Sequence, residues 1–251
     1  MNYTIAVAGK GGTGKTTLAA LLIFELLRQG RTPILAVDAD PNANLGQVLG
    51  VQVTHTIGSI CDQATGSLSQ VPQGMTKEDY LELHLQRAVH EASGFDLLSM
   101  GRPEGPGCYC YVNNLIRRLM GQLASNYPIV VIDNEAGLEH LSRRTTRKAD
   151  LLLLISDSSL RGLQAAKRIT ELVQELKIEI GQLGLIVNRL IDPLSPEFTR
   201  QLDELGVPLL ATIPYDSSLS TLDGQGQPLV NLPVDAPAAV ETSELIRKIL
   251  R

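Results

Sequence analysis

The chain has 251 residues and a mass of 27.1 kDa, with 43% hydrophobic and 20% charged residues. This composition is typical of a packed globular protein and excludes intrinsic disorder, collagen and coiled coil as the main state. Acidic residues outnumber basic residues by 27 to 22, so no overall positive charge attracts nucleic acid or anionic lipid. The length suits a single α/β domain over residues 1–251.

Short apolar segments alternate along the chain with longer segments of helical periodicity, which predicts strands alternating with helices. The expected strands are Thr4 to Ala8, Pro33 to Val37, Phe95 to Ser99, Ile129 to Ile132, Leu151 to Ile155, Leu183 to Val187 and Leu209 to Ile213. The expected helices are Thr16 to Gln29, Lys77 to Ala92, Asn113 to Ser125, Leu160 to Leu176, Ser195 to Leu205 and Ala236 to Leu250. We therefore expect an α/β fold, in which helices cover both faces of a mostly parallel central sheet in three layers.

Three further features concern the setting of the chain. The longest apolar run, Leu18 to Phe24, is far shorter than the ~18 residues that suggest a membrane span. The chain starts without a charged leader or cleavage site. Its three cysteines are too few, and odd in number, for a disulfide framework. We therefore expect a cytoplasmic protein that binds neither membrane nor nucleic acid.

The first chemical motif is Gly9 to Thr16, which matches the phosphate-binding pattern G-x-x-x-x-G-K-[ST] between an expected strand and an expected helix. Glycines let backbone N–H groups approach phosphate at the positive end of the following helix. Lys15 is expected to reach the terminal phosphates, Thr16 to offer its hydroxyl to Mg²⁺, and Thr17 to add a contact. Backbone contacts are expected from Gly11, Gly12, Thr13 and Gly14. An incidental glycine-rich turn is the alternative, which the flanking strand and helix disfavour.

A second lysine, Lys10, lies inside the loop. It cannot easily fold back onto phosphates that its own backbone surrounds, but it can reach a neighbour's nucleotide across a symmetric interface. A solvated lysine is the alternative. The string GKGGTGKTT resembles the deviant Walker A loop of the MinD, ParA and nitrogenase iron protein class of P-loop NTPases. This resemblance covers nearly the whole chain and implies ATP or ADP as ligand, ATP hydrolysis, and an ATP-sandwiched homodimer in which Lys10 acts in trans.

Two carboxylates, Asp38 and Asp40, follow the second expected strand. At this spacing they can face a shared Mg²⁺ and water site, whereas an acidic turn is the alternative. By resemblance the segment is switch I. Asp38 then lies near Mg²⁺ and Asp40 positions the attacking water, with Asn42 and Asn44 near phosphate or partner.

The apolar strand Ile129 to Ile132 delivers Asp133 at its end, as expected for an aspartate that holds magnesium-bound water. The residues after it are expected to form switch II, in which the N–H of Gly137 contacts the γ-phosphate and senses its loss. An exposed helix position is expected for His140. Asn188 matches the family's adenine-reading asparagine, with Pro214 and Tyr215 closing the same pocket, although an asparagine at a strand end is often only a turn residue.

Cys108 and Cys110 follow a segment dense in glycine and proline, residues 101–107. Two thiolates at this spacing supply half of a four-ligand site for Ni²⁺ or Zn²⁺, and a twofold-related copy supplies the other half. A redox pair, disfavoured by its strained ring, and two incidental loop cysteines are the alternatives. Cys61 is expected to serve packing.

The C-x-C loop, together with DNEAGLEHLSR at Asp133 to Arg143, resembles the CooC/AcsF-type ATPases. These proteins mature nickel-containing carbon monoxide dehydrogenase and acetyl-CoA synthase. The resemblance implies a metallochaperone with its metal at the dimer interface and one of those two enzymes as its client. The alternative is a MinD- or ParA-like switch that binds membrane or DNA, which the short last helix of mixed charge does not favour.

Overall fold

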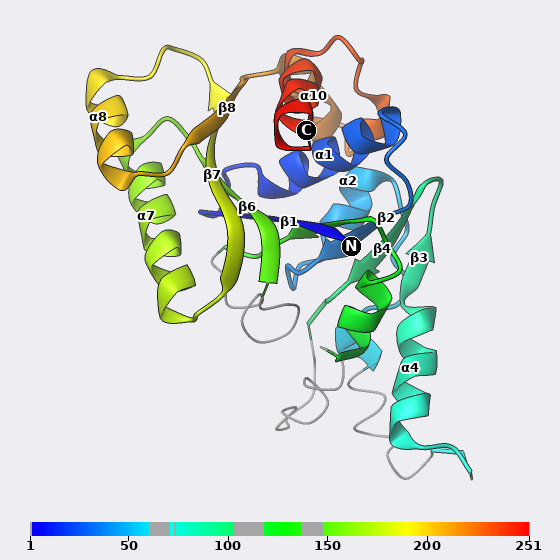
Figure 1. The fold of residues 1–251 in the computed structure, drawn as a ribbon. Coiled ribbons are helices and arrows are strands. Elements are labelled where there is room, and N and C mark those ends of the chain that lie inside the picture. Colours follow the sequence, from blue (N-terminus) through cyan, green and yellow to red (C-terminus); the bar gives the residue numbers. More distant parts are fainter. Residues whose placement is uncertain (1, 61–70, 73, 103–117, 137–147, 251) are drawn as a thin grey trace.

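The computed structural model describes residues 2–60, 71–72, 74–102, 118–136 and 148–250. In these ranges eight strands form one sheet in the order β3-β4-β2-β5-β1-β6-β7-β8 (Figure 1). Neighbouring strands are parallel, except that β3 runs antiparallel to β4 at one edge. The strands are β1 (Tyr3–Gly9), β2 (Ile34–Asp38), β3 (Val89–Glu91), β4 (Phe95–Ser99), β5 (Ile129–Asp133), β6 (Lys148–Ser156), β7 (Glu179–Leu190) and β8 (Leu209–Pro214).

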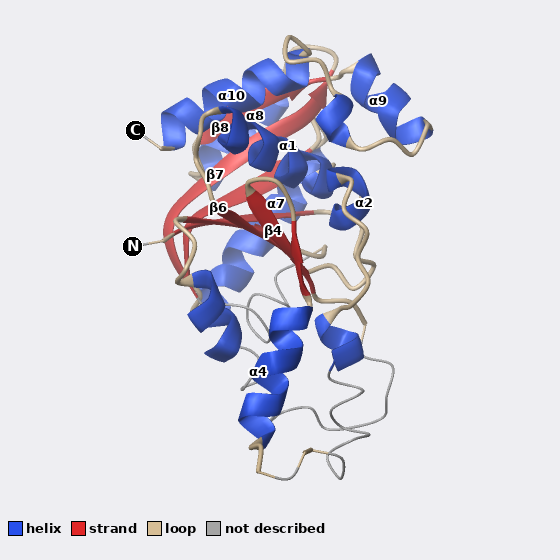
Figure 2. Cartoon of the chain, turned by 90° about the vertical axis from the view of Figure 1, so that its right-hand side faces the viewer, coloured by secondary structure: helices blue, strands red, loops and turns tan. Residues whose placement is uncertain are grey.

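Helices lie on both faces of the sheet, so that the sheet forms the middle layer (Figure 2). One face carries α1 (Lys15–Arg28), α2 (Leu45–Leu49), α9 (Ser217–Gly224), the short 3₁₀ helix η1 (Leu229–Asn231) and α10 (Pro237–Ile249). The other carries α4 (Lys77–Arg87), the helical residues 118–124, α7 (Leu160–Glu175) and α8 (Pro196–Leu205). The predicted α/β fold with a mostly parallel sheet is therefore confirmed.

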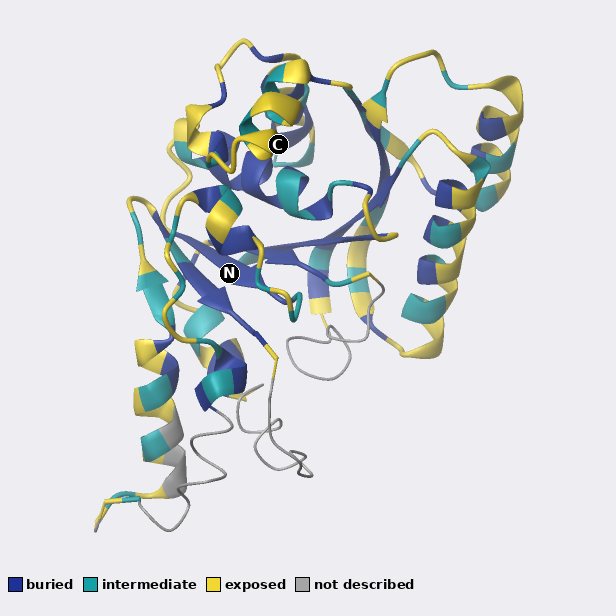
Figure 3. Ribbon diagram, turned by 180° about the vertical axis from the view of Figure 1, so that it is seen from behind, coloured by how far each residue is buried: buried dark blue, intermediate teal, exposed yellow. Residues whose placement is uncertain are grey.

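The strands are apolar because the sheet is buried on both faces. In β1, Ile5 and Val7 belong to the core under α1 and α10, whereas Ala6 and Ala8 belong to the core under α7. These four side chains are fully buried. Figure 3 shows the same distribution over the molecule, with buried strands and exposed outer surfaces of the helices. Burial on both faces accounts for continuous apolar runs where a one-sided sheet would show alternation.

The predicted helix Lys77 to Ala92 is too long. It ends at Arg87, and Val89–Glu91 instead form the edge strand β3, which pairs with β4 from Val89 opposite Leu98 to Glu91 opposite Asp96. A tight turn causes this change, since Ala92 N donates to Phe95 O at 2.9 Å and Gly94 adopts a φ of 85°. Glycine tolerates this conformation, so the turn folds β3 back onto β4.

The segment from Pro214 to Pro237 is more ordered than a surface excursion. It contains α9 and η1, and the side chains of Leu229 and Leu232 are buried in the core beside α1. The short helix α2 was not predicted either. Of the predicted helix Asn113 to Ser125, residues 118–124 are helical and residues 113–117 lie outside the described ranges. None of the helices in these ranges is long and apolar enough to cross a membrane.

Candidate nucleotide site

The loop between β1 and α1 closes around the main-chain carbonyl of Lys10. This oxygen accepts hydrogen bonds from Thr13 Oγ1 at 2.9 Å, Thr13 N at 3.4 Å and Lys15 Nζ at 3.3 Å. The Lys15 side chain is buried, whereas Lys10 is exposed. The loop therefore holds the ammonium of Lys15 within itself and leaves the side chain of Lys10 at the surface.

Two consecutive residues of β7 hold this loop through side-chain hydrogen bonds to its carbonyl oxygens. Asn188 Nδ2 donates to Thr13 O at 2.8 Å, and Arg189 Nη1 donates to Gly12 O at 3.1 Å. Gly14 adopts a φ of 89°, and a Cβ added there would lie 2.4 Å from Asn188 Nδ2. Both contacts use carbonyl oxygens of the loop, an arrangement compatible with anion binding by its N–H groups.

Replacing Gly14 with alanine is expected to destabilise the protein more than replacing Gly12 with alanine. Both glycines have positive φ, but a Cβ at Gly12 meets open space, whereas a Cβ at Gly14 would displace the Asn188 amide. Backbone strain of about 1–3 kcal/mol applies to both variants, and only Gly14→Ala adds the lost contact. Urea unfolding of the two variants measures the difference; equal free energies of unfolding would contradict the role given to Asn188.

Three polar side chains lie side by side at the carboxyl ends of neighbouring strands. The register places Asp38 of β2 opposite Ser99 of β4 and Asp133 of β5, and all three are buried. Among the described residues, neither carboxylate oxygen of Asp133 has a hydrogen-bond partner. Burial raises the pKa of Asp133 to about 6, although the Thr16 hydroxyl and the Lys15 charge act in the opposite direction. Burial likewise raises the pKa of Asp38 to about 7.

The residues at this edge fit a magnesium ion. Mg²⁺ prefers oxygen ligands, and a buried carboxylate without a partner is costly unless a cation compensates it. Asp133 supplies two such oxygens, with the Thr16 hydroxyl as a neighbouring donor group. Within the described ranges, no cluster of three or more His, Cys, Asp and Glu side chains is arranged to hold a metal by itself. Mg²⁺ is commonly bound by one or two carboxylates together with substrate phosphates, so a bound nucleotide would supply the remaining ligands.

Asp38 holds the segment that follows β2. Its Oδ1 accepts from Asp40 N at 3.1 Å, and its Oδ2 accepts from Leu45 N, the first residue of α2, at 2.8 Å. The carboxylate thus fixes both ends of residues 39–44. Its position beside Mg²⁺ stays a prediction.

A cleft of about 540 Å³ lies above the phosphate loop. It brings together predicted residues from two segments: Gly11, Gly12, Gly14, Lys15, Thr16 and Thr17 from the loop, and Asp40, Asn42 and Asn44 after β2. Glu135, in the segment after β5 that is predicted to form switch II, lines it as well. The carboxyl ends of parallel strands meet at this edge, which is where α/β sheets bind ligands.

Arg189, Asp223 and Gln227 also line the cleft, and none of them was predicted as a site residue. Asn188 uses its amide to hold the phosphate loop, and Tyr215 is 51% exposed, with its hydroxyl accepting from Ser220 Oγ at 3.2 Å. Sequence reasoning missed Asp223 and Gln227 because it expected no helix in that segment. It also missed Arg189, although this residue directly follows the predicted Asn188. The roles of Asn188, Pro214 and Tyr215 at adenine stay predictions.

Several predicted site residues lie outside the described ranges. These are Gly137 of the predicted switch II and Cys108 and Cys110 of the predicted metal site, and their predicted roles are taken up below as proposals. Cys61, predicted to serve packing, and His140, predicted as an exposed helix position, also lie outside these ranges.

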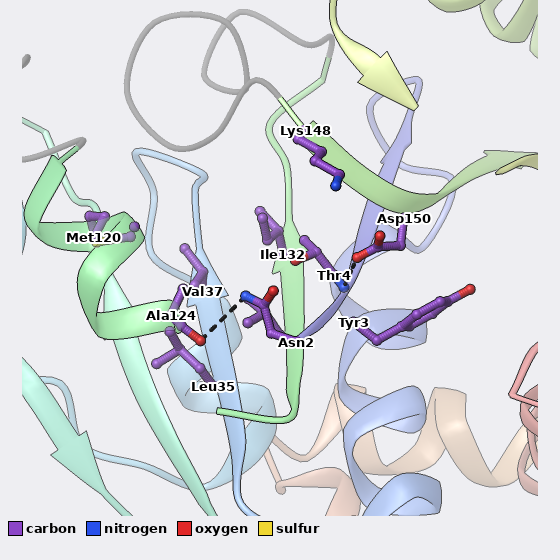
Figure 4. A pocket seen from close by; sticks show the side chains of 12 residues that line it. Asn2, Tyr3, Thr4, Leu35, Val37, Met120, Ala124, Ile132, Lys148 and Asp150 are labelled. Carbon is purple, nitrogen blue, oxygen red and sulfur yellow. Dashed lines mark hydrogen bonds between the residues drawn. The ribbon is translucent and has the colours of Figure 1, made fainter. Parts of the chain in front are cut away.

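A second cavity, also of about 540 Å³, lies along one face of the sheet, between β1, β2, β5 and the helical residues 118–124, and reaches the start of β6 (Figure 4). Thr4 N donates to Asp150 Oδ2 at 2.8 Å, and Asn2 Nδ2 donates to Ala124 O at 3.4 Å. Apolar side chains form much of the remaining wall, including Leu35, Val37, Met120 and Ile132. The cavity lies away from the phosphate loop, and we assign no role to it.

Residues 4–229 match the model of the CobQ/CobB/MinD/ParA nucleotide binding domain. The chain belongs to this family. Membership agrees with a phosphate loop at the carboxyl end of β1 and shows that the chain carries a nucleotide-binding domain.

Similar proteins of the CobQ/CobB/MinD/ParA family include both curated sequences and solved structures. An uncharacterized ATP-binding protein of Methanocaldococcus jannaschii is 43% identical over 252 residues, or 98% of each chain. The carbon monoxide dehydrogenase accessory protein CooC of Rhodospirillum rubrum is 32% identical over 234 residues, covering 88% of this chain and 87% of CooC. The septum site-determining protein MinD of Pyrococcus horikoshii, solved with Mg-ADP, shares the fold with a TM-score of 0.71 at 24% identity, over 99% of this chain and 96% of MinD.

Proposed function

We propose that the protein is an ATP-hydrolysing metallochaperone that assists nickel insertion into carbon monoxide dehydrogenase or acetyl-CoA synthase. The observation that carries this proposal is the meeting of a phosphate loop, Asp40 and Asp133 at one sheet edge in a chain that also holds the Cys108-x-Cys110 pair. Nucleotide binding by the family supports the ATPase part, and the identity to CooC supports the nickel part.

In the proposed reaction the loop N–H groups and Lys15 bind the phosphates of ATP. Asp40 accepts a hydrogen bond from the attacking water and orients it. The water oxygen bonds to the γ-phosphorus as the bond to the bridging oxygen breaks, which gives ADP and inorganic phosphate. Mg²⁺, held through Thr16 and Asp133, would neutralise phosphate charge. The N–H of Gly137 then loses its acceptor, so the following segment is free to change conformation.

The metal part of the proposal requires two copies of the chain. Cys108 and Cys110 supply two thiolates, and a tetrahedral or square-planar ion takes four ligands. A homodimer related by a twofold axis brings the second pair to the same ion. Lys10 supports such a dimer, because its side chain is exposed while its carbonyl closes the loop, so the ammonium is accessible to a partner's nucleotide. Ni²⁺ or Zn²⁺ is then the cargo, and nucleotide state controls its release.

A metal titration with and without ATP tests this function. Wild-type protein is expected to bind Ni²⁺ or Zn²⁺ with an affinity that changes when ATP is added, and more tightly as pH rises, because thiolates must lose protons to bind. The Cys108→Ser, Cys110→Ser protein is expected to lose this binding and to keep its affinity for ADP. Metal bound by that variant with wild-type affinity would contradict the site.

A MinD- or ParA-like positioning switch is the second candidate, favoured by the shared fold and by 28% identity over 244 residues to MinD of Synechocystis. The last turn of α10 offers only Arg247 and Lys248 as basic residues, which is little for an anionic surface. Pelleting with anionic liposomes or duplex DNA separates the two candidates. Strong ATP-dependent binding to either would favour the switch over metal delivery.

A further inference from the structure

A chain of side-chain hydrogen bonds runs from the end of β4 to the nucleotide cleft. Arg102 Nη2 donates to Asn42 Oδ1 at 2.6 Å, between residues that are 60 positions apart in the sequence. Asn42 in turn donates twice to one oxygen of Asp40, from its backbone N at 2.8 Å and from Nδ2 at 2.9 Å. Two of the three residues, Asp40 and Asn42, line the cleft.

Arg102 determines which end of the Asn42 amide faces Asp40. A side-chain amide has one accepting end and one donating end, whereas a guanidinium only donates. Because Arg102 occupies the amide oxygen, Nδ2 of Asn42 faces the carboxylate. Turning the amide by half a rotation would place its NH₂ against the guanidinium and its oxygen against Asp40, and both hydrogen bonds would be lost.

The two donors of Asn42 fix one oxygen of Asp40 and leave the other available. Oδ1 accepts both hydrogen bonds, and within the described part of the chain Oδ2 accepts none. A carboxylate with one oxygen held by two donors keeps a defined orientation. Oδ2 is therefore the oxygen that accepts a hydrogen bond from water in the cleft.

Asp38 anchors both ends of this chain of hydrogen bonds, through its backbone carbonyl and through its side chain. Met100 N donates to Asp38 O at 2.8 Å, and Asp38 Oδ1 accepts from Asp40 N at 3.1 Å. Arg102 follows Met100 by two residues, and Asp40 follows Asp38 by two residues. The arginine and the aspartate therefore start from neighbouring strands whose pairing fixes the distance between them.

We propose that Arg102 and Asn42 are positioning residues that orient Asp40 toward the attacking water. This inference rests on the proposed function, in which Asp40 orients that water. Arg102 is not among the residues lining the cleft, so its effect passes through Asn42. The positioning role predicts a loss in turnover with little change in nucleotide affinity.

Steady-state ATP hydrolysis tests the role. Arg102→Ala is expected to lower kcat about 10-fold and to leave KM within about twofold, as for loss of an interaction that acts on the chemical step. Arg102→Lys keeps a donor and is expected to restore kcat to within about threefold of wild type. Arg168→Ala, which removes the same charge from the exposed surface of α7, is the matched control and is expected to turn over like wild type.

A double-mutant cycle separates this role from a merely structural one. If Arg102 acts through Asn42, the Arg102→Ala, Asn42→Ala protein is expected to be no slower than Asn42→Ala alone. Additive losses, or equal changes in KM and kcat, would overturn the inference. Asp40→Ala distinguishes failure of this inference from failure of the proposed function. If Asp40→Ala is inactive while Arg102→Ala matches wild type, only the inference fails. If Asp40→Ala hydrolyses ATP normally, the proposed function fails as well.

Discussion

Lys15→Ala is expected to weaken ATP and ADP binding by about 100-fold, on the order of 3 kcal/mol, because it removes a buried charge that pairs with phosphate. The loop already holds this ammonium inside itself, 3.3 Å from the Lys10 carbonyl, so nucleotide phosphates meet a charge that is in place. Calorimetric titration with Mg-ADP measures the loss. Affinity within about threefold of wild type would contradict the assignment of the cleft to phosphate.

Lys10→Ala is the matched control for Lys15→Ala. The two lysines lie in one loop, but the Lys10 side chain is exposed and only its carbonyl takes part in the loop's hydrogen bonds. The variant is expected to bind ADP like wild type and to fail in ATP-dependent dimer formation and hydrolysis, because we propose that this lysine acts on the partner's nucleotide. Normal hydrolysis by Lys10→Ala would contradict the action in trans and leave the phosphate site intact.

Asp133→Asn is expected to stabilise the nucleotide-free protein at alkaline pH. Burial raises the pKa of Asp133 from its ordinary value of 3.8 to about 6, so the native state binds this proton more tightly than the unfolded state. The contribution of this proton to the free energy of unfolding is fully present below pH ~4 and is lost as pH rises through about 6. At pH 8 the wild type holds a buried carboxylate whose charge Lys15 and Thr16 offset only in part, and the asparagine removes that charge. The expected gain is on the order of 2–3 kcal/mol.

Urea unfolding between pH 4 and pH 8 measures this difference. The variant and wild type are expected to converge near pH 4 and to separate as pH rises, whereas Asp203→Asn, an exposed change on α8, is expected to follow wild type throughout. With Mg-ADP the wild type is expected to be more stable than the variant, because the asparagine lacks the charge that is proposed to bind the cation. A variant that is less stable than wild type at pH 8, or is stabilised equally by Mg-ADP, would contradict the proposed role of Asp133.

The sequence predicts most of the sheet because its central strands are buried on both faces and carry continuous apolar runs. The edge strand Val89–Glu91 was not predicted, because its short polar sequence continues the helical periodicity of α4 until the turn at Gly94. Helices α2 and α9 were not predicted either, for a related reason. Each is short, and α9 has no buried residue from which a helical period can be recognised.

The positions of the phosphate loop, Asp40 and Asp133 beside one sheet edge are predictable because each lies at a fixed spacing from a strand end. The function of Asn188 in holding Thr13, and the contact between Arg102 and Asn42, depend on approaches across 175 and 60 positions of the sequence. No local pattern marks such contacts. They follow from the strand order, which places β7 near the loop after β1 and β4 beside β2.

Native mass spectrometry of the protein loaded with ATP and Ni²⁺ or Zn²⁺ tests whether two copies of the chain share one metal ion. We expect a dimer that carries a single metal ion, and a metal-free dimer when Cys108 and Cys110 are both replaced by serine. A metal-loaded monomer, or an unchanged metal content in the double variant, would contradict it.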